Sequence, residues 1–222
     1  MSTSISERIT DICASLPPSV RLIAVSKTFP SEAIRAAYAA GIRDFGENRI
    51  QEAASKQAEL KDLPDITWHF IGHLQSNKAK KAIELFHWIH SVDNLNLAQR
   101  LNQLAQELGI NPQVCLQVKI LPDPNKSGWN VPELLANLPA LNQCQNLQIQ
   151  GLMTITPLGL NDAETINVFN SAHKLAQEIR EQNWSHLKMQ ELSMGMSGDY
   201  QLAVQAGATM IRLGTILFGQ RT

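Results

Sequence analysis

The sequence predicts an α/β fold, a single (β/α)8 barrel of the TIM type, on the strength of three observations. Short β-branched or apolar runs alternate with longer amphipathic stretches along the whole chain. Strands that alternate with helices imply parallel pairing, because each crossover helix returns the chain to the same end of the sheet. Eight such units close naturally into a barrel, and the length of 222 residues suits one. An open, doubly wound sheet is the main alternative.

The expected strands are short and apolar, and an extra helix over residues 4–16 precedes the first of them. Each strand except the last is followed by a longer helical segment, and a short helix closes the chain. The eight expected strands cover residues 21–26, 43–45, 66–71, 88–92, 113–120, 147–154, 188–192 and 209–213.

Helix boundaries follow from caps and periodicity. The clearest helix begins near Asn94, carries apolar residues on one face and stops at Gly109, a typical C-terminal glycine. A second periodic stretch predicts a helix over 162–182. Ser31 follows a proline and opens a shorter helix, and Ser197 is expected as the N-cap of the helix before the last strand.

Composition bounds the class of protein. The chain is 44% hydrophobic and 18% charged with a net charge of −1, so no electrostatic case exists for nucleic acid or for an anionic membrane. No linker or low-complexity tract divides it, which favours one domain over residues 1–222. The first residues lack the apolar run of a signal peptide, and no stretch could span a bilayer. Three widely spaced cysteines are expected to be buried thiols, so we expect a cytoplasmic protein.

Lys27 is the candidate reactive group. It follows the apolar strand in RLIAVSKTFP, and the C-terminal strand ends of a parallel barrel converge on one mouth. A lysine pKa of about 10.4 keeps the side chain protonated at neutral pH, but partial burial makes the neutral amine accessible. A neutral amine can condense with an aldehyde to form an imine. Taken alone, a lysine at a strand end is more often a solvated side chain.

The last strand and the segment before it suit an anion. In MIRLGTILFG, Gly214 and Thr215 turn the chain into the final short helix, whose free N–H groups attract negative charge. The preceding ELSMGMSGDY adds small and hydroxyl residues, among them Ser193 and Ser197, that fit the other half of a phosphate site. A plain strand-to-helix turn would explain the Gly-Thr pair equally well.

Other site chemistries have little support in the sequence. His69 and His73 are four residues apart, but Gly72 interrupts any helix and no cysteine or carboxylate nearby completes a metal site. We therefore expect no metal, and we expect His69 and His87 to be hydrogen-bonded core or rim residues. The chain also lacks a G-x-S-x-G elbow, a P-loop and a G-x-G-x-x-G fingerprint.

Several segments together resemble one known family, the pyridoxal phosphate homeostasis proteins, also called YggS- or PROSC-like. They span the chain in the order typical of that family, and the loop VKILPDPNKSGW is similar to that of cyanobacterial members. The matching segments are LIAVSKTFP, DFGENRIQEA, WHFIGHLQSNKAK, IHSVD, GLMTI, LSMGMSGDY and IRLGTILFG.

The resemblance implies a barrel like the N-terminal domain of alanine racemase, with pyridoxal 5′-phosphate as cofactor. It implies an imine on Lys27, and Ser193, Gly214 and Thr215 at the phosphate. It further implies Arg212 at the pyridine nitrogen, with Asn48 and Met153 near the ring.

Arg212 and Lys119 have further implications for the site. An arginine keeps its charge, so Arg212 at the ring nitrogen would hold that atom unprotonated and make the ring a poor electron sink. A structural salt bridge is the alternative for Arg212. Lys119 departs from the family, in which many members have asparagine at the end of the fifth strand. That departure leaves the roles of Lys119 and Lys126 open.

The resemblance favours a pyridoxal 5′-phosphate-binding protein that acts in vitamin B6 and amino/keto acid homeostasis without robust catalytic turnover. Apo-enzymes that use the cofactor are the expected recipients. The alternative is an amino-acid racemase, but racemisation needs an acid and a base on opposite faces of the substrate, and Lys27 serves only one. Tyr38 and Tyr200 both fall on expected helices. A regulatory protein that senses the cofactor is a third possibility, and we expect a monomer.

Overall fold

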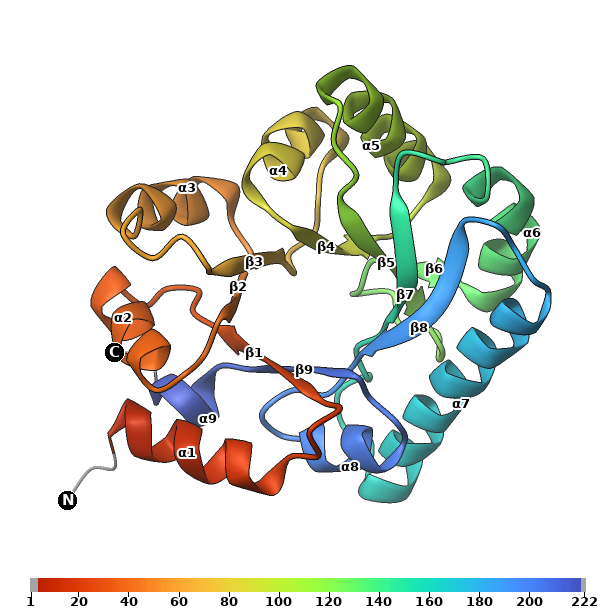
Figure 1. The fold of residues 1–222 in the computed structure, drawn as a ribbon. Coiled ribbons are helices and arrows are strands. Elements are labelled where there is room, and N and C mark those ends of the chain that lie inside the picture. Colours follow the sequence, from red (N-terminus) through yellow and green to blue (C-terminus); the bar gives the residue numbers. More distant parts are fainter. Residues whose placement is uncertain (1–3, 221–222) are drawn as a thin grey trace.

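The eight expected strands close into a parallel barrel in a computed structural model of the chain, which describes residues 4–220 (Figure 1). The strands pair in the order β1–β2–β3–β4–β5–β7–β8–β9, and β9 pairs with β1 to close the ring. The barrel strands are β1 Arg21–Val25, β2 Asp44–Glu47, β3 Thr67–Phe70, β4 Trp88–Val92, β5 Gln113–Lys119, β7 Gln148–Met153, β8 Leu187–Ser193 and β9 Met210–Leu213.

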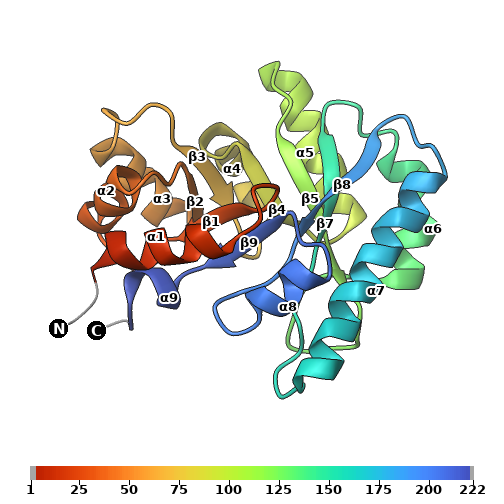
Figure 2. The same ribbon diagram turned by 60° about the horizontal axis from the view of Figure 1, so that its bottom comes forward.

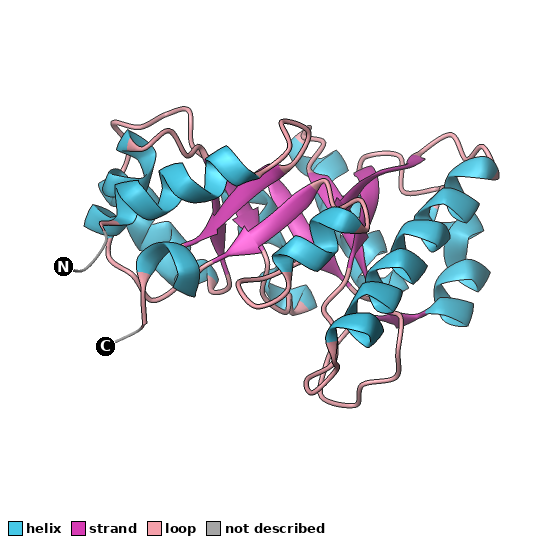
Figure 3. Cartoon of the chain, turned by 90° about the horizontal axis from the view of Figure 1, so that it is seen from below, coloured by secondary structure: helices cyan, strands magenta, loops and turns pink. Residues whose placement is uncertain are grey.

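Helices surround the barrel in the view along its axis (Figure 1), and the two turned views also place them on its outside (Figures 2 and 3). The expected helix before the first strand is present as α1, which lies beside α9 and is tied to it by the Arg8 Nε–Leu217 O hydrogen bond of 2.6 Å. The helices are α1 Ile5–Ser15, α2 Ser31–Ala39, α3 Ile50–Glu59, the 3-10 turn η1 Ser76–Lys78, α4 Ala79–Leu85, α5 Leu95–Leu108, α6 Val131–Leu141, α7 Asp162–Glu181, α8 Tyr200–Gln205 and α9 Thr215–Phe218.

The helix ends obey the capping rules that predicted them. Asn94 caps α5 by accepting a hydrogen bond from the N–H of Leu97, and Gly109 ends the helix in the left-handed region with φ of 65°. At the start of α7, Asn161 and Glu164 form a reciprocal capping box. Local chemistry therefore determines where these two helices begin and end.

The barrel interior is packed with side chains. Ile23, Trp88, Cys115, Met153 and Met210 come from five different strands and form one buried cluster. Residues on non-adjacent strands can touch in this way only across the inside of a barrel. A second, larger cluster fills the layer between the strands and the helices. The interior is thus closed, and a ligand can enter only at an end.

Three features differ from the sequence-based expectations. Ser197 is not an N-cap: α8 begins at Tyr200, and Asp199 occupies the cap position. The loop after β5 contains an additional two-residue strand, β6 Trp129–Asn130, which is too short to show any periodicity. Cys13 is exposed, whereas Cys115 and Cys144 are buried as expected. Across residues 4–220, no helix combines the length and apolar character needed to cross a membrane.

Candidate functional site

A cavity of about 310 Å³ opens at the C-terminal ends of the strands and collects four of the seven expected site residues. Lys27, Arg212, Gly214 and Thr215 all line it, although they come from opposite ends of the chain. Pairing of β1 with β9 brings the two segments together. The remaining lining residues are Val25, Ile71, Ile155, Met196, Ser197 and Gly198.

Lys27 lies on a strained turn directly after β1. The next residue, Thr28, adopts a φ of 69°, which a β-branched side chain rarely tolerates. Its N–H donates a hydrogen bond of 2.5 Å to Oε1 of Glu52, at the start of α3. Such a conformation persists only where the surroundings over-determine it, so other contacts must hold this turn.

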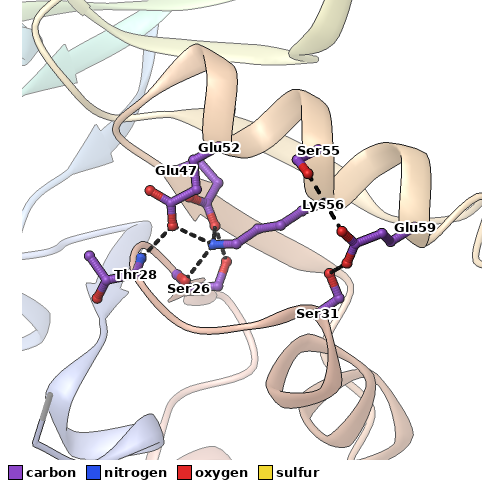
Figure 4. A network of polar contacts seen from close by, with 8 residues as sticks. All are labelled: Ser26, Thr28, Ser31, Glu47, Glu52, Ser55, Lys56 and Glu59. Carbon is purple, nitrogen blue, oxygen red and sulfur yellow. Dashed lines mark hydrogen bonds and ion pairs between the residues drawn. The ribbon is translucent and has the colours of Figure 1, made fainter. Parts of the chain in front are cut away.

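A buried ion cluster centred on Lys56 supplies those contacts (Figure 4). Lys56 Nζ donates to the Ser26 carbonyl at 2.8 Å and lies 2.7 Å from Oε1 of both Glu47 and Glu52. Ser26 Oγ donates to the same Glu47 oxygen at 2.7 Å. The residues on both sides of Lys27 are therefore tied to one cation, and the backbone that carries the amine is fixed.

At Glu47, burial and hydrogen bonding have opposite effects on the pKa of the carboxyl group. Its side chain has no exposed surface, and burial raises its pKa, while Lys56 and Ser26 act in the opposite direction. A buried carboxylate is tolerated only when a cation and hydrogen bonds compensate for lost hydration. Lys56 supplies both, so Glu47 depends on it.

Arg212 projects from β9 into the barrel mouth and is 4% exposed. Its Nη1 donates to Ser193 Oγ at 2.7 Å and its Nη2 to the Thr154 carbonyl at 3.1 Å. Burial lowers its pKa to about 10, so the guanidinium stays charged at neutral pH. Within residues 4–220 no carboxylate lies within ion-pair distance of it, so the salt-bridge alternative is not what the structure contains.

The other end of the cavity is rich in neutral hydrogen-bond donors. Backbone N–H groups of Gly214 and Ile216 point at Ser197 Oγ over 3.4 and 3.5 Å, which are long and weak hydrogen bonds. The hydroxyl of exposed Thr215 lies beside them in the cavity lining. A side chain at Gly214 would bring its Cβ within 3.3 Å of the Val25 carbonyl, so glycine allows this close approach. These donors are only weakly engaged, so they are available to an anion.

Three expected site residues lie outside the cavity lining. Ser193 is fully buried, with its hydroxyl held between Arg212 and His90, and this position does not support direct contact with a phosphate. Met153 is 1% exposed and lies beneath Ile155, which packs against its cluster. Asn48 lines a neighbouring pocket, and its buried Oδ1 has no hydrogen-bond partner within residues 4–220.

Neither of the two lysines left open by the sequence lines the cavity. Lys119 lines a separate depression against the loop that follows β5. Lys126 is bonded to the Thr156 carbonyl and lies 3.5 Å from Asp123 Oδ2, so it anchors that loop across the end of β7. Lys27 is thus the lysine of the described chain that lines the cavity.

Comparison with known proteins identifies relatives over nearly the full chain. The family model described as alanine racemase, N-terminal domain, matches residues 2–222. A pyridoxal phosphate homeostasis protein from Synechocystis sp. is 58% identical over 211 residues, which cover 95% of this chain and 96% of the relative. These likenesses concern the whole barrel and not one motif.

Solved structures also match nearly the whole of this chain. PipY from Synechococcus elongatus, solved without pyridoxal phosphate (PLP) and with PLP bound, has a TM-score of 0.94 in both forms. The identities are 60% and 59%, and both comparisons cover 97% of this chain and all of PipY. Alanine racemase from Clostridium difficile has a TM-score of 0.76 at 16% identity, and 57% of its chain is covered. That second likeness shows a shared fold.

The Lys56 cluster generates a stability prediction. Lys56→Met should lower the free energy of unfolding by about 3 kcal/mol, because it leaves the buried Glu47 carboxylate without a cation. Urea titration followed by tryptophan fluorescence at pH 7 measures this loss. Lys174→Met is the matched control, since Lys174 is 78% exposed and lies 3.7 Å from Glu178. Equal, small effects of both substitutions would contradict the assigned role of Lys56.

Proposed function

Because the chain belongs to the alanine racemase N-terminal domain family and, within it, to the pyridoxal phosphate homeostasis proteins, we propose that it binds pyridoxal 5′-phosphate at the barrel mouth. The observation that carries the proposal is one cavity lined by a lysine amine, a buried arginine and a group of neutral donors. PipY, whose structure holds PLP, is 59% identical to this chain and supports the choice of ligand.

The lining residues fit three of the polar parts of the cofactor: the aldehyde, the phosphate and the ring nitrogen. Its aldehyde can condense with the Lys27 amine, forming a C=N bond and releasing one water. Its phosphate suits the donors of Gly214, Thr215, Ile216 and Ser197, whose mutual hydrogen bonds are long. We place Ser197 there instead of Ser193, because only Ser197 lines the cavity.

Arg212 is proposed to meet the pyridine nitrogen. Its guanidinium stays charged and carries only N–H donors, so it pairs with an unprotonated ring nitrogen. When bound, the cofactor supplies an electrophilic aldehyde and an electron-withdrawing ring, and an unprotonated nitrogen weakens the second property. Arg212 therefore favours holding the cofactor over using it for carbanion chemistry.

Asn48 and Met153 remain proposed neighbours of the ring. The end of β2 lies between the ends of β1 and β3, and Lys27 and Ile71, which follow those two strands, both line the cavity, which supports the position of Asn48. Met153 lies in the layer beneath, where it supports Ile155. Neither residue is given a direct contact in this proposal.

The proposed role is a cytoplasmic, monomeric carrier that holds the cofactor in vitamin B6 and amino/keto acid homeostasis and passes it to apo-enzymes. Among the described residues that line the cavity, Lys27 carries the only amine. Tyr38 donates to Asp65 on the outer surface and Tyr200 is buried in α8, so neither lines the cavity. This arrangement supports binding over two-base racemisation.

Lys27→Ala should abolish the covalent adduct with pyridoxal 5′-phosphate, because the variant lacks the one amine that the described residues bring to the cavity. Absorbance spectra before and after borohydride, with the labelled peptide identified by mass, measure the adduct. Lys119→Ala is the control, since it removes another strand-end lysine that faces a different depression. A reducible adduct that persists in Lys27→Ala, or that disappears in Lys119→Ala, would disprove the assignment.

Racemisation of L-alanine or L-serine should not exceed a control of buffer plus free cofactor, because the described part of the cavity lining contains a single amine. Chiral chromatography of long incubations with the loaded protein measures the rate. A robust rate that disappears in Lys27→Ala would establish the racemase alternative.

Thr215→Val should weaken retention of the cofactor about tenfold, because it removes one hydroxyl donor from the phosphate group. Equilibrium dialysis of the loaded protein measures retention, and Ser197→Ala should act in the same direction. Thr10→Val, which alters an exposed hydroxyl on α1, is the control. Retention equal to that of the control would rule out a phosphate contact at Thr215.

A further inference from the structure

A chain of polar side chains crosses the barrel interior and ends at Arg212. It starts at Asp44 at the beginning of β2 and runs through β3, β4 and β8 to β9. Successive atoms are separated by 2.9, 2.9, 2.8 and 2.7 Å. The atom pairs are Asp44 Oδ1–His69 Nε2, His69 Nδ1–His90 Nε2, His90 Nδ1–Ser193 Oγ and Ser193 Oγ–Arg212 Nη1.

The chemistry of the two ends dictates the direction of every hydrogen bond between them. Arg212 can only donate, so Ser193 Oγ accepts from it. Ser193 gives its own proton to Nδ1 of His90, because neutral rings of the opposite tautomer would turn an unprotonated Nε2 of His69 toward the Asp44 carboxylate. His90 then carries its hydrogen on Nε2 and donates to Nδ1 of His69. His69 in turn donates from Nε2 to Asp44, whose carboxylate can only accept. When both imidazoles are neutral, they therefore have the same tautomer, with the hydrogen on Nε2.

The surroundings favour these neutral states. Both rings are fully buried, and burial lowers both pKa values below the usual histidine range. The positive charges of Arg212 and Arg21 lower the pKa of His90 further, and Asp44 partly opposes the effect at His69. Trp88 stacks on His69 with an interplanar angle of 13°, which fixes the ring orientation.

We propose that Asp44, His69, His90 and Ser193 are positioning residues that hold Arg212 as a charged, donor-only group at the cavity. Ser193 and Thr154 engage Nη1 and Nη2 from inside the barrel, and the guanidinium edge that remains lines the cavity. The consequence for ligand choice, which rests on the proposed function, is that the oriented guanidinium selects a ring whose nitrogen is unprotonated. A pyridine nitrogen meets that requirement, and a ring carbon or a protonated nitrogen does not.

Histidine tautomers in the cofactor-free protein test the chain directly. Long-range proton–nitrogen NMR correlation at pH 7 should show His69 and His90 neutral, with the hydrogen on Nε2. His173 is the internal contrast, because its Nδ1 lies 2.8 Å from the Ala206 carbonyl and must carry the hydrogen instead. An Nδ1–H tautomer or a doubly protonated ring at His69 or His90 would overturn the chain.

Ligand affinity tests the role of the chain. Ser193→Ala should lose about tenfold in affinity for pyridoxal 5′-phosphate, because Arg212 loses its innermost acceptor. The loss should be absent for the benzene analogue that keeps the aldehyde, hydroxyl and phosphate but has C–H in place of the ring nitrogen. Ser193→Thr, which keeps the hydroxyl, should retain the wild-type preference, and His173→Gln serves as the control outside the chain.

The outcomes separate this inference from the proposed function. An equal loss for both ligands in Ser193→Ala would show that Ser193 serves packing alone and would overturn the positioning role. Thermal unfolding of the same samples identifies a variant that is merely unstable, and His90→Gln then replaces it in the comparison. Failure of the wild-type protein to form an adduct with either aldehyde would refute the proposed function, while the tautomer result would stand on its own.

Discussion

Everything at the mouth of this barrel depends on the pairing of the first strand with the last. The register sets Ala24 opposite Leu213, so Val25 lies opposite Gly214 and the two turns that follow meet. A shift of one residue would exchange the two faces of β9 and point Arg212 into the helical layer. The close approach at Gly214 belongs to the same constraint, since a Cβ there would crowd the Val25 carbonyl. The same β1–β9 pairing thus closes the barrel and brings the two halves of the site together.

Two buried polar systems support Lys27 and Arg212 in the cavity, and the two systems compensate for lost hydration in different ways. Behind Lys27, Lys56 compensates the charge of Glu47 with an ion pair, at a high cost of lost hydration. Behind Arg212, neutral imidazoles carry a one-way series of hydrogen bonds and add no net charge of their own. Both systems fix a cavity group before any ligand arrives, so binding does not have to order them. Preorganisation of this kind suits a protein that holds its ligand.

The sequence predicts the scaffold well because strands and helix ends depend on patterns of residues that are close together in the chain. Apolar runs located all eight barrel strands, and Asn94 with Gly109 located α5, since capping involves residues only a few positions apart. The position of Lys27 followed from the rule that strand ends converge. The sequence does not predict β6, because two residues show no period. The prediction of Ser197 as a helix cap is wrong, because its hydrogen-bond partners Gly214 and Ile216 lie on the turn after β9.

The supporting residues could not be predicted in the same way. His69 was expected to be hydrogen-bonded in the core, which is confirmed, but its partner His90 is identified only by the geometry of the closed barrel. His90 and Ser193 lie on strands that are not neighbours, and no spacing in a single sequence shows that two inward-facing side chains meet. In the sequence Lys56 resembles any other helix lysine. Only the structure shows that its amine donates to the Ser26 carbonyl in the turn after β1.

The same fold serves alanine racemase, so the fold cannot decide whether this chain catalyses a reaction. The decision rests with the groups that reach the cavity. A catalyst of proton transfer at carbon needs an electron sink and two opposed proton carriers, whereas a carrier needs one reversible covalent bond and a firm hold on the phosphate. Here the Lys27 amine, the weakly engaged N–H donor of Gly214 and the charged Arg212 guanidinium line one cavity. Those groups support the proposed role of a carrier, because the described residues of the cavity lining supply one amine, whereas racemisation needs two opposed proton carriers.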